Sequence, residues 1–220
     1  MNRGEVMESE STRQRLLSNA ERLMAEKGIA ATSVREITDA SEANVAAVNY
    51  YFGSKTELLL EILKRRFLQL DAELLERLNA VTARNNTTAP DIAELTGAYF
   101  DALVNLGFDP RTGRRDPFIY LIQRASSEQE AVLTRAQDYT APGISRLIGL
   151  LLATTPQIDR EMLQAPVLIG LMFTTSVDAM EAMAAEESNP ALVGAIRAFL
   201  VAGVKAYLSR LETTITSRGA

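Results

Sequence analysis

Side chains suited to binding a nucleic-acid duplex are grouped between residues 44 and 55. The amide of Asn49 matches the N6 and N7 edge of adenine. Tyr50 offers a hydroxyl for a phosphate and a ring edge for a thymine methyl, and Lys55 offers a charge for a phosphate. Asn44 stands where it can cap a helix and leave the first amides facing an anion. The segment therefore favours contact with DNA.

Few other chemistries are open to the chain. Its 220 residues include no cysteine and no histidine, so disulfides, a nucleophilic thiol, and the usual zinc ligands and general base are absent. Carboxylates, Lys, Tyr and Ser remain, without a paired-carboxylate or nucleophile–base pattern. No catalytic residue, metal site or cofactor is predicted, and an enzyme is the weakest of the functional alternatives.

The charge distribution is compatible with DNA binding but does not favour it. The net charge is −5, whereas nucleic-acid binders are commonly basic. Residues 1–66 carry ten Lys or Arg and ten Asp or Glu, which leaves 13 and 18 for the other 154 residues. The acidity thus lies in the C-terminal part, and the neutral N-terminal part should bind non-target DNA weakly.

Three capping-box patterns predict helix starts: Ser11 with Gln14, Ser33 with Glu36, and Ser54 with Glu57. The first helix should run from residue 12 to Gly28, a helix-ending residue. Between the second and third boxes the sequence predicts helix 34–40, a turn at 41–44 and helix 45–52, the order of a helix-turn-helix. Within the second of these, Val48 and Phe52 share a face, while Ala46 and Tyr50 point the opposite way.

The segment resembles the tetracycline-repressor (TetR) family of bacterial regulators. The resemblance rests on residues 31–37, ATSVREI, and more specifically on residues 48–58, VNYYFGSKTEL, and it covers about residues 12–60. Taken alone, the Tyr-Tyr-Phe cluster is more typical of a core, and a solvated helix position is the minority alternative for Arg35. The resemblance implies that DNA is contacted by Thr32, Arg35, Ala46, Asn49, Tyr50, Tyr51 and Lys55. Asn44 is added to these residues because of its position before the helix.

The chain departs from the family in the turn between the two short helices. Where the family usually has glycine, this sequence has Glu42 within Ser41-Glu42-Ala43. A positive φ at this position would be strained for glutamate, and the carboxylate would lie near phosphates. The geometry of this turn and the effect of Glu42 on DNA affinity therefore do not follow from the resemblance.

The rest of the chain is predicted to be helical as well, giving an all-α fold of about nine helices. The expected division is a flexible tail (1–11), the DNA-binding domain (12–60), an effector-binding and dimerisation domain (61–212) and a tail (213–220). Long helices are expected at 58–79, 91–106, 167–185 and 191–211. No apolar run is long enough to span a bilayer and no signal peptide is evident, so a cytoplasmic protein without membrane contact is expected.

The resemblance implies a small-molecule effector site in the C-terminal bundle. Aromatic and sulfur-containing side chains there favour a mainly apolar ligand. These candidates are Phe67, Tyr99, Phe100, Phe118, Tyr120, Met162, Met172 and Phe173. Ordinary core packing is the alternative for the methionines.

The resemblance also implies a homodimer formed by the last two helices. One face of the final helix carries apolar side chains and a glycine that lets a second helix approach closely. This dimer stripe consists of Leu192, Ile196, Phe199, Gly203 and Tyr207. The alternative is that this stripe packs inside the monomer. The sequence thus predicts a ligand-responsive transcription regulator, a repressor, that binds a palindromic DNA operator as a homodimer. A helical small-molecule-binding or adaptor protein that does not bind DNA is the main alternative.

Overall fold

The computed structural model describes residues 3–84, 89–107, 116–158 and 190–218, together with Glu161, Leu163 and Met172. Helices account for the secondary structure of these residues, and no strand is found among them. The predicted all-α class is confirmed. None of the described helices is both long and apolar enough to cross a membrane.

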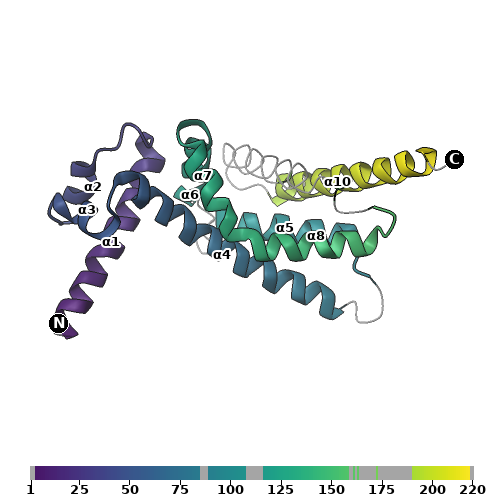
Figure 1. Cartoon of the computed structure of the whole chain (residues 1–220), viewed down its shortest axis with the longest axis horizontal. Coiled ribbons are helices and arrows are strands. Elements are labelled where there is room, and N and C mark those ends of the chain that lie inside the picture. Colours follow the sequence, from purple (N-terminus) through teal and green to yellow (C-terminus); the bar gives the residue numbers. More distant parts are fainter. Residues whose placement is uncertain are drawn as a thin grey trace. The chain divides into compact units, whose positions relative to one another are not determined.

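The helices follow the chain in a simple order (Figure 1). Their bounds are α1 Arg3–Lys27, α2 Val34–Ala40, α3 Ala46–Phe52, α4 Lys55–Arg84, α5 Ile92–Gly107, α6 Pro117–Glu128, α7 Glu130–Gln137, α8 Ala141–Thr154 and α10 Pro190–Arg218, with a 3-10 turn at Asp138–Thr140 between α7 and α8.

The chain forms two compact units. Unit 1 comprises Met1–Leu68 and Asp116–Tyr139, and unit 2 comprises Gln69–Arg115 and Thr140–Ala220. Helices α6 and α7 thus belong to the same unit as the predicted helix-turn-helix. The sequence had suggested a division by function at residue 60, and that functional division stays a prediction.

The first helix begins earlier than predicted. Helix α1 starts at Arg3, so residues 3–11 are helical rather than a tail, and Ser11 lies inside the helix. The Ser11 hydroxyl accepts a hydrogen bond from the Arg15 guanidinium (3.3 Å) instead of capping a helix start. The segment before Ser11 is rich in Glu and contains no proline, which permits the helix to continue.

Helix α6 holds the end of α1 within unit 1. Gly28 ends α1 with a φ of +104°, as its sequence position predicted. Arg124 donates from Nε to the Ala25 carbonyl (2.9 Å) and from Nη2 to the Glu26 carbonyl (3.3 Å), two of the carbonyls that a helix end leaves without partners. The Glu128 carboxylate accepts from the Ala30 amide (2.7 Å). The loop that leads into α2 is therefore fixed by α6.

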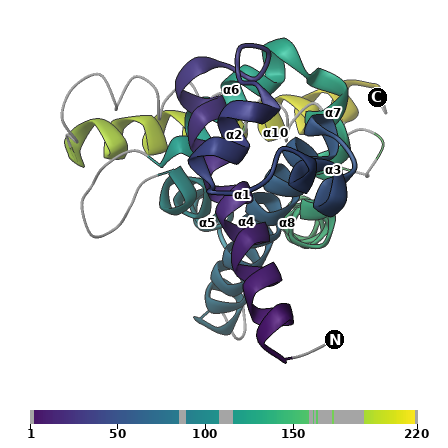
Figure 2. The same ribbon diagram turned by 90° about the vertical axis from the view of Figure 1, so that its left-hand side faces the viewer.

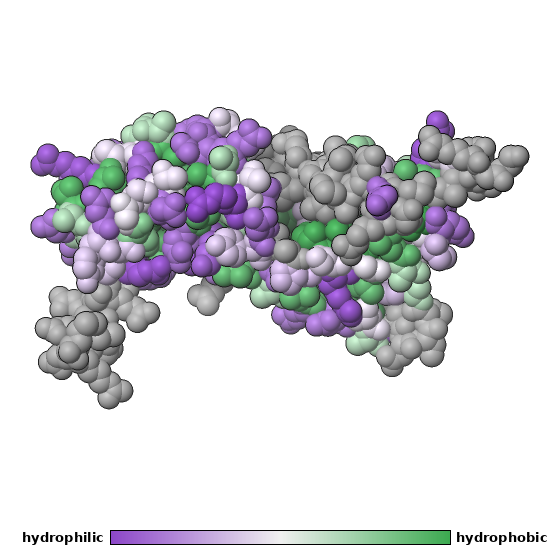
Figure 3. Space-filling model, viewed as in Figure 1, coloured by the Kyte–Doolittle hydropathy of each residue, from purple (hydrophilic) through white to green (hydrophobic). Residues whose placement is uncertain are grey.

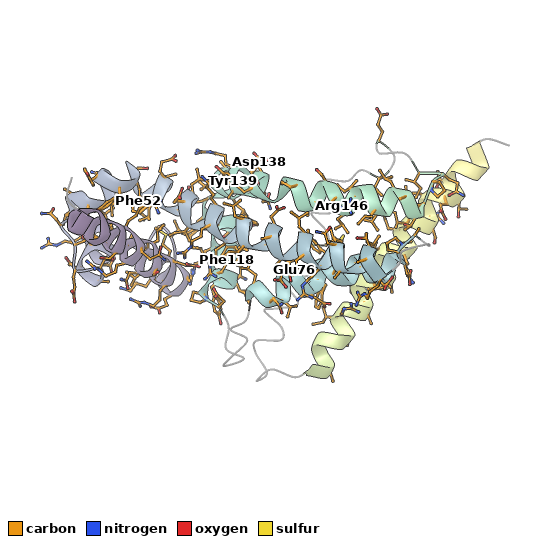
Figure 4. The ribbon with its side chains drawn as sticks, turned by 90° about the horizontal axis from the view of Figure 1, so that it is seen from below. Phe52, Glu76, Phe118, Asp138, Tyr139 and Arg146 are labelled. Atoms are coloured by element: carbon orange, nitrogen blue, oxygen red, sulfur yellow. The ribbon has the colours of Figure 1, made fainter. Side chains whose placement is uncertain are left out.

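Buried aromatic and charged residues join α1, α4 and α6 in the interior of unit 1. The Phe67 and Phe118 rings meet edge to face with centroids 5.9 Å apart, and Phe118 is seen on α6 in Figure 4. Glu21 is 4% exposed and accepts from Arg65 Nη2 and Arg66 Nε, each at 2.6 Å. Arg66 also donates to Asp116 (2.7 Å), whose carboxylate caps α6 at the Phe118 amide. We call Glu21, Arg65, Arg66 and Asp116 the ion cluster.

Unit 2 is organised around α5, which is buried along most of its length. Its buried residues run from Leu95 to Phe100 without interruption. Helix α10 packs on α5, and Leu200, Val204 and Leu208 of α10 are at most 5% exposed. On the same two helices Arg197 pairs with Asp101 (3.1 Å) across Gly97, where the guanidinium occupies the space of a side chain.

Candidate DNA-binding interface

The helix-turn-helix of unit 1 begins with a complete capping box on α2. The Ser33 hydroxyl accepts from the Glu36 amide (3.2 Å), and the Glu36 carboxylate accepts from the Ser33 amide (2.8 Å), which confirms the predicted pattern. Lys27 Nζ donates to the other Glu36 oxygen at 2.7 Å. The bond from Lys27 and those from Ser33 lower the pKa of Glu36 to about 2.

This pKa makes the stability of α2 depend on pH. Because the folded-state pKa lies below the ordinary value of 4.5, the stabilisation by ionised Glu36 is complete above that value and is lost as pH falls towards 2. We expect parent and Glu36→Gln to differ in unfolding free energy at pH 7 and to converge by about pH 2. Denaturant unfolding across that range checks this, with Glu130→Gln as a charge-matched control. A difference that persists unchanged at pH 2 would contradict the assignment.

The turn between α2 and α3 contains Glu42, the residue at which the sequence departs from the family pattern. Glu42 has a φ of +50° and is exposed. Its neighbour Ser41 is buried and donates to the Ile37 carbonyl (2.7 Å), while the Ala43 amide donates to the Thr38 carbonyl (2.9 Å). Arg15 of α1 donates to the Ser41 carbonyl (3.0 Å), so the turn is held from both sides. The left-handed conformation is thus imposed on a glutamate.

Helices α2 and α3 are the two short helices labelled in Figure 2, and most of the predicted contact residues on α3 are exposed. Tyr50 is 81% exposed, Ala46 and Asn49 are also exposed, and Val48 is fully buried, as the helical spacing predicted. Tyr51 is half-buried, with its ring edge to face with that of Tyr50 at 4.9 Å. Phe52 is half-buried beneath the Arg13 guanidinium, which lies 5.3 Å from its ring.

Helices α2 and α4 add two exposed or half-exposed cations. Arg35 of α2 is exposed. The Ser54 hydroxyl accepts from the Glu57 amide (3.1 Å), so the third predicted helix start is correct. Lys55, in the first turn of α4, lies 3.5 Å from the Ala30 carbonyl. Burial lowers the pKa of Lys55, and the charges of Glu128 and Glu36 act in the opposite direction.

The side chains of two predicted contact residues, Thr32 and Asn44, make hydrogen bonds within unit 1. The Thr32 side chain is fully buried, and its hydroxyl donates to the carbonyl oxygens of Gly28 (2.7 Å) and Leu23 (3.2 Å). The hydroxyl thus stabilises the loop, and the DNA contact expected of Thr32 stays a prediction. Val45, not Asn44, is the N-cap residue of α3, and the Asn44 carboxamide oxygen accepts from the Ala46 amide (2.9 Å), so that amide is not left for a phosphate. Sequence reasoning also missed Val45, which is 51% exposed four residues before Asn49.

The predicted effector residues are divided between the units. Phe67, Phe118 and Tyr120 lie in unit 1, while Tyr99, Phe100 and Met172 lie in unit 2. All are buried except half-buried Tyr120. Met162 and Phe173 lie outside the described residues.

The predicted dimer stripe on α10 is mixed in character. Phe199 is 70% exposed and Gly203 is exposed, with nothing within 4 Å of the position of an added Cβ. Ile196 and Tyr207 are half-buried, and the Tyr207 hydroxyl donates to the Leu163 carbonyl (2.8 Å) of the same chain. The Leu192 side chain lies outside the described residues.

Comparison with known proteins identifies the helix-turn-helix. Residues 16–62 match the family described as bacterial regulatory proteins, tetR family. The chain is 34% identical over 93 residues to the probable HTH-type transcriptional regulator YttP of Bacillus subtilis (strain 168), an alignment that spans 42% of each chain. This chain thus matches less than half the length of that curated relative.

Solved structures match over most of the chain. A TetR family transcription regulator from Marinobacter aquaeolei VT8 has a TM-score of 0.63 at 16% identity and covers 89% of this chain and 96% of its own. A putative tetR family transcription regulator from Shewanella sp. PV-4 has a TM-score of 0.62 at 15% identity, with 87% and 97% covered. At these identities the likeness shows the fold. Residues 16–62, which contain the capped α2 and the exposed face of α3, thus match the TetR family of helix-turn-helix regulators, and the chain shares the fold of solved structures from that family.

Proposed function

We propose that this protein is a ligand-responsive repressor that binds a palindromic operator as a homodimer. The observation that carries the DNA-binding part is the exposure of Ala46, Asn49 and Tyr50 on one face of α3. The face is held outward by buried Val48, and Arg35 of the preceding helix α2 is also exposed. Groove-facing side chains on α3 would specify the site, and cations on α2 and α4 would hold phosphates.

The homodimer is supported by α10. Its buried face is Leu200, Val204 and Leu208, whereas Phe199 and Gly203 face solvent. An exposed phenylalanine on a long helix, next to a glycine that permits close approach, is suited to packing against a second copy. Two copies related by a two-fold axis would read two half-sites about 34 Å apart, so the operator should be palindromic.

The effector is expected to be small, mainly apolar and bound beside α5 in unit 2. Tyr99 and Phe100 are buried there, and burial raises the pKa of Tyr99, so its hydroxyl stays neutral. The Thr96 hydroxyl is fully buried without a hydrogen-bond partner among the described residues. Such a group favours a ligand that supplies a hydrogen-bonding atom.

A DNA selection tests this function. DNA fragments from the source genome are incubated with the protein at two salt concentrations, and bound fragments are sequenced. We expect enrichment of a palindromic site with a steep salt dependence. Enrichment of a site without two-fold symmetry would contradict the dimer, and no enrichment at low salt would contradict DNA binding.

Lys55→Ala gives the first variant prediction on the selected site. Loss of one phosphate contact should lower the slope of log affinity against log salt by about 0.9 and weaken binding about tenfold. Lys205→Ala is the matched control, because Lys205 lies on α10 in unit 2 and pairs with Asp91. If the two variants bind with the same slope, Lys55 does not contact a phosphate.

A helical ligand-binding or adaptor protein without DNA binding is the second candidate. It is favoured by Glu42, whose carboxylate is exposed in the turn before α3 where phosphates would lie. It predicts a bound small molecule but no salt-dependent association with any duplex.

A further inference from the structure

Four residues form the outward face of α3 and of Val45, the residue directly before it. Val45, Ala46, Asn49 and Tyr50 are all exposed, and the i, i+4 spacing pairs Val45 with Asn49 and Ala46 with Tyr50 on neighbouring ridges. Figure 3 shows hydrophobic residues among hydrophilic ones at the α2–α3 end of unit 1. We call these four residues the reading face.

The reading face lacks the charged side chains that most commonly read G·C pairs. Residues 45–52 are VAAVNYYF and contain no Lys, Arg, Asp or Glu. Arginine or lysine on guanine O6 and N7 is the commonest specific contact in the major groove, and carboxylates accept from cytosine N4. Helix α3 can make neither contact.

The side chains that are present match an A·T pair. The Asn49 carboxamide is exposed and makes no hydrogen bond with the described residues, so it is free to pair with adenine N6 and N7. Val45 is 51% exposed, which is unusual for valine, and an aliphatic side chain in the groove packs on the thymine C5 methyl. Ala46 beside it is small enough to let α3 approach the bases closely.

The charged groups around α3 have other roles. The Arg13 guanidinium is bound to Glu61 at 2.9 Å and lies over the Phe52 ring. Lys55 is on α4, with its amine 3.5 Å from the Ala30 carbonyl. Arg35 is on α2, the helix that crosses the DNA backbone in this motif.

We propose that the base pairs read by α3 are A·T pairs, with Asn49 reading adenine and Val45 the thymine methyl. This inference rests on the proposed DNA-binding function and adds the base composition of the operator half-site. Lys55 and Arg35 then supply phosphate affinity without base choice.

Base analogues in the selected operator test the assignment. Thymine is replaced one position at a time by uracil, which lacks only the C5 methyl. We expect the parent to bind about fourfold more weakly at a contacted thymine, the equivalent of one buried methyl group, and Val45→Ala to bind both duplexes alike at that position. Replacing the paired adenine by 7-deazaadenine should weaken the parent several-fold and leave Asn49→Ala unaffected.

Matched controls separate base readout from stability. Leu68→Ala removes an exposed aliphatic side chain from α4, and Asn79→Ala removes an exposed amide. Both should keep the full sensitivity of the parent to each analogue.

The outcomes are distinct. The inference is overturned if the base pairs whose recognition changes in the Val45→Ala and Asn49→Ala variants are G·C pairs. It is also overturned if neither variant alters the response to the base analogues. In both cases the proposed function stands. If the parent enriches no site, the proposed function fails and the inference falls with it.

Discussion

Glu21→Gln is expected to lower the free energy of unfolding by about 3 kcal/mol, because it leaves two guanidinium groups without their shared partner in the interior of unit 1. The Glu21 side chain is 5% exposed, and those of Arg66 and Arg65 are 16% and 28% exposed. Removing one member of a buried ion pair typically costs 3–5 kcal/mol, and the partial exposure of both arginines favours the lower end.

A matched change on the same helix should have little effect. Glu26 pairs with Arg22 at 3.1 Å, and their side chains are 55% and 46% exposed. Exposed pairs of this kind contribute under about 0.5 kcal/mol, so Glu26→Gln should be nearly neutral. Equal effects of the two substitutions would show that the ion cluster is not buried as described.

The two arginines should also differ from each other. Arg66 bridges Glu21 and Asp116, and Asp116 caps α6, so Arg66→Met leaves Asp116 without its partner and Glu21 with only one. Among the described residues Arg65 bonds only to Glu21, and its buried Nε has no hydrogen-bond partner there. Arg65→Met should therefore cost less than Arg66→Met. Because the chain forms two units, hydrogen exchange of the α1 and α6 amides is the measurement that reports on unit 1 alone.

The ion cluster also shows where sequence patterns stop being informative. Glu21, Arg65 and Asp116 lie far apart in the chain, and nothing in their local spacing indicates that they meet. One local signal was available: Asp116-Pro117 before an apolar run is typical of a helix start, and Asp116 does cap α6. The partner of that cap depends on tertiary packing.

Short-range patterns were informative where one helix determines the outcome. Ser33 with Glu36 and Ser54 with Glu57 mark true helix starts, and Val48 is buried while Tyr50 is exposed. Ser11 with Gln14 fits the same pattern but lies inside α1, because residues that permit helix precede it. A capping pattern indicates that a helix can begin at a residue. It does not indicate that the residues before it are non-helical.

Roles carried over from the family were less secure than helix positions. Thr32 occupies a position expected to face DNA, yet its hydroxyl is fully buried against Gly28 and Leu23 carbonyls. Val45 was not singled out because valine is typical of a core, and only its exposure of 51% in the structure shows that it faces outward. Burial decides both cases.

Glu42→Gly is expected to tighten DNA binding and to stabilise unit 1, because it removes two separate penalties at the turn. A left-handed φ costs a residue with a Cβ about 1–2 kcal/mol, and glycine gives back about 0.5–1 kcal/mol through its greater freedom in the unfolded chain. The φ of +50° at Glu42 should therefore yield a net gain of about 0.5–1 kcal/mol.

The carboxylate is the second penalty, and Glu42→Gln isolates it. Glutamine retains the Cβ and hence the strain, so this variant should gain no stability. It should bind duplex DNA more tightly at low salt, with the gain shrinking as the Debye length falls below about 10 Å near 0.1 M salt. Glu76→Gln makes the same charge change at an exposed position of α4, labelled in Figure 4, and should leave DNA binding unchanged.

The pair of variants distinguishes the two candidate functions. Tighter binding by both, with added stability only in Glu42→Gly, means that the chain binds DNA through this turn and that Glu42 weakens the contact. If Glu42→Gln bound DNA more weakly than the parent, the carboxylate would be accepting a hydrogen bond from a base or a bound water and would belong to the contact surface. If even Glu42→Gly showed no salt-dependent binding, the turn charge would not be what prevents DNA contact, and the adaptor function would be favoured.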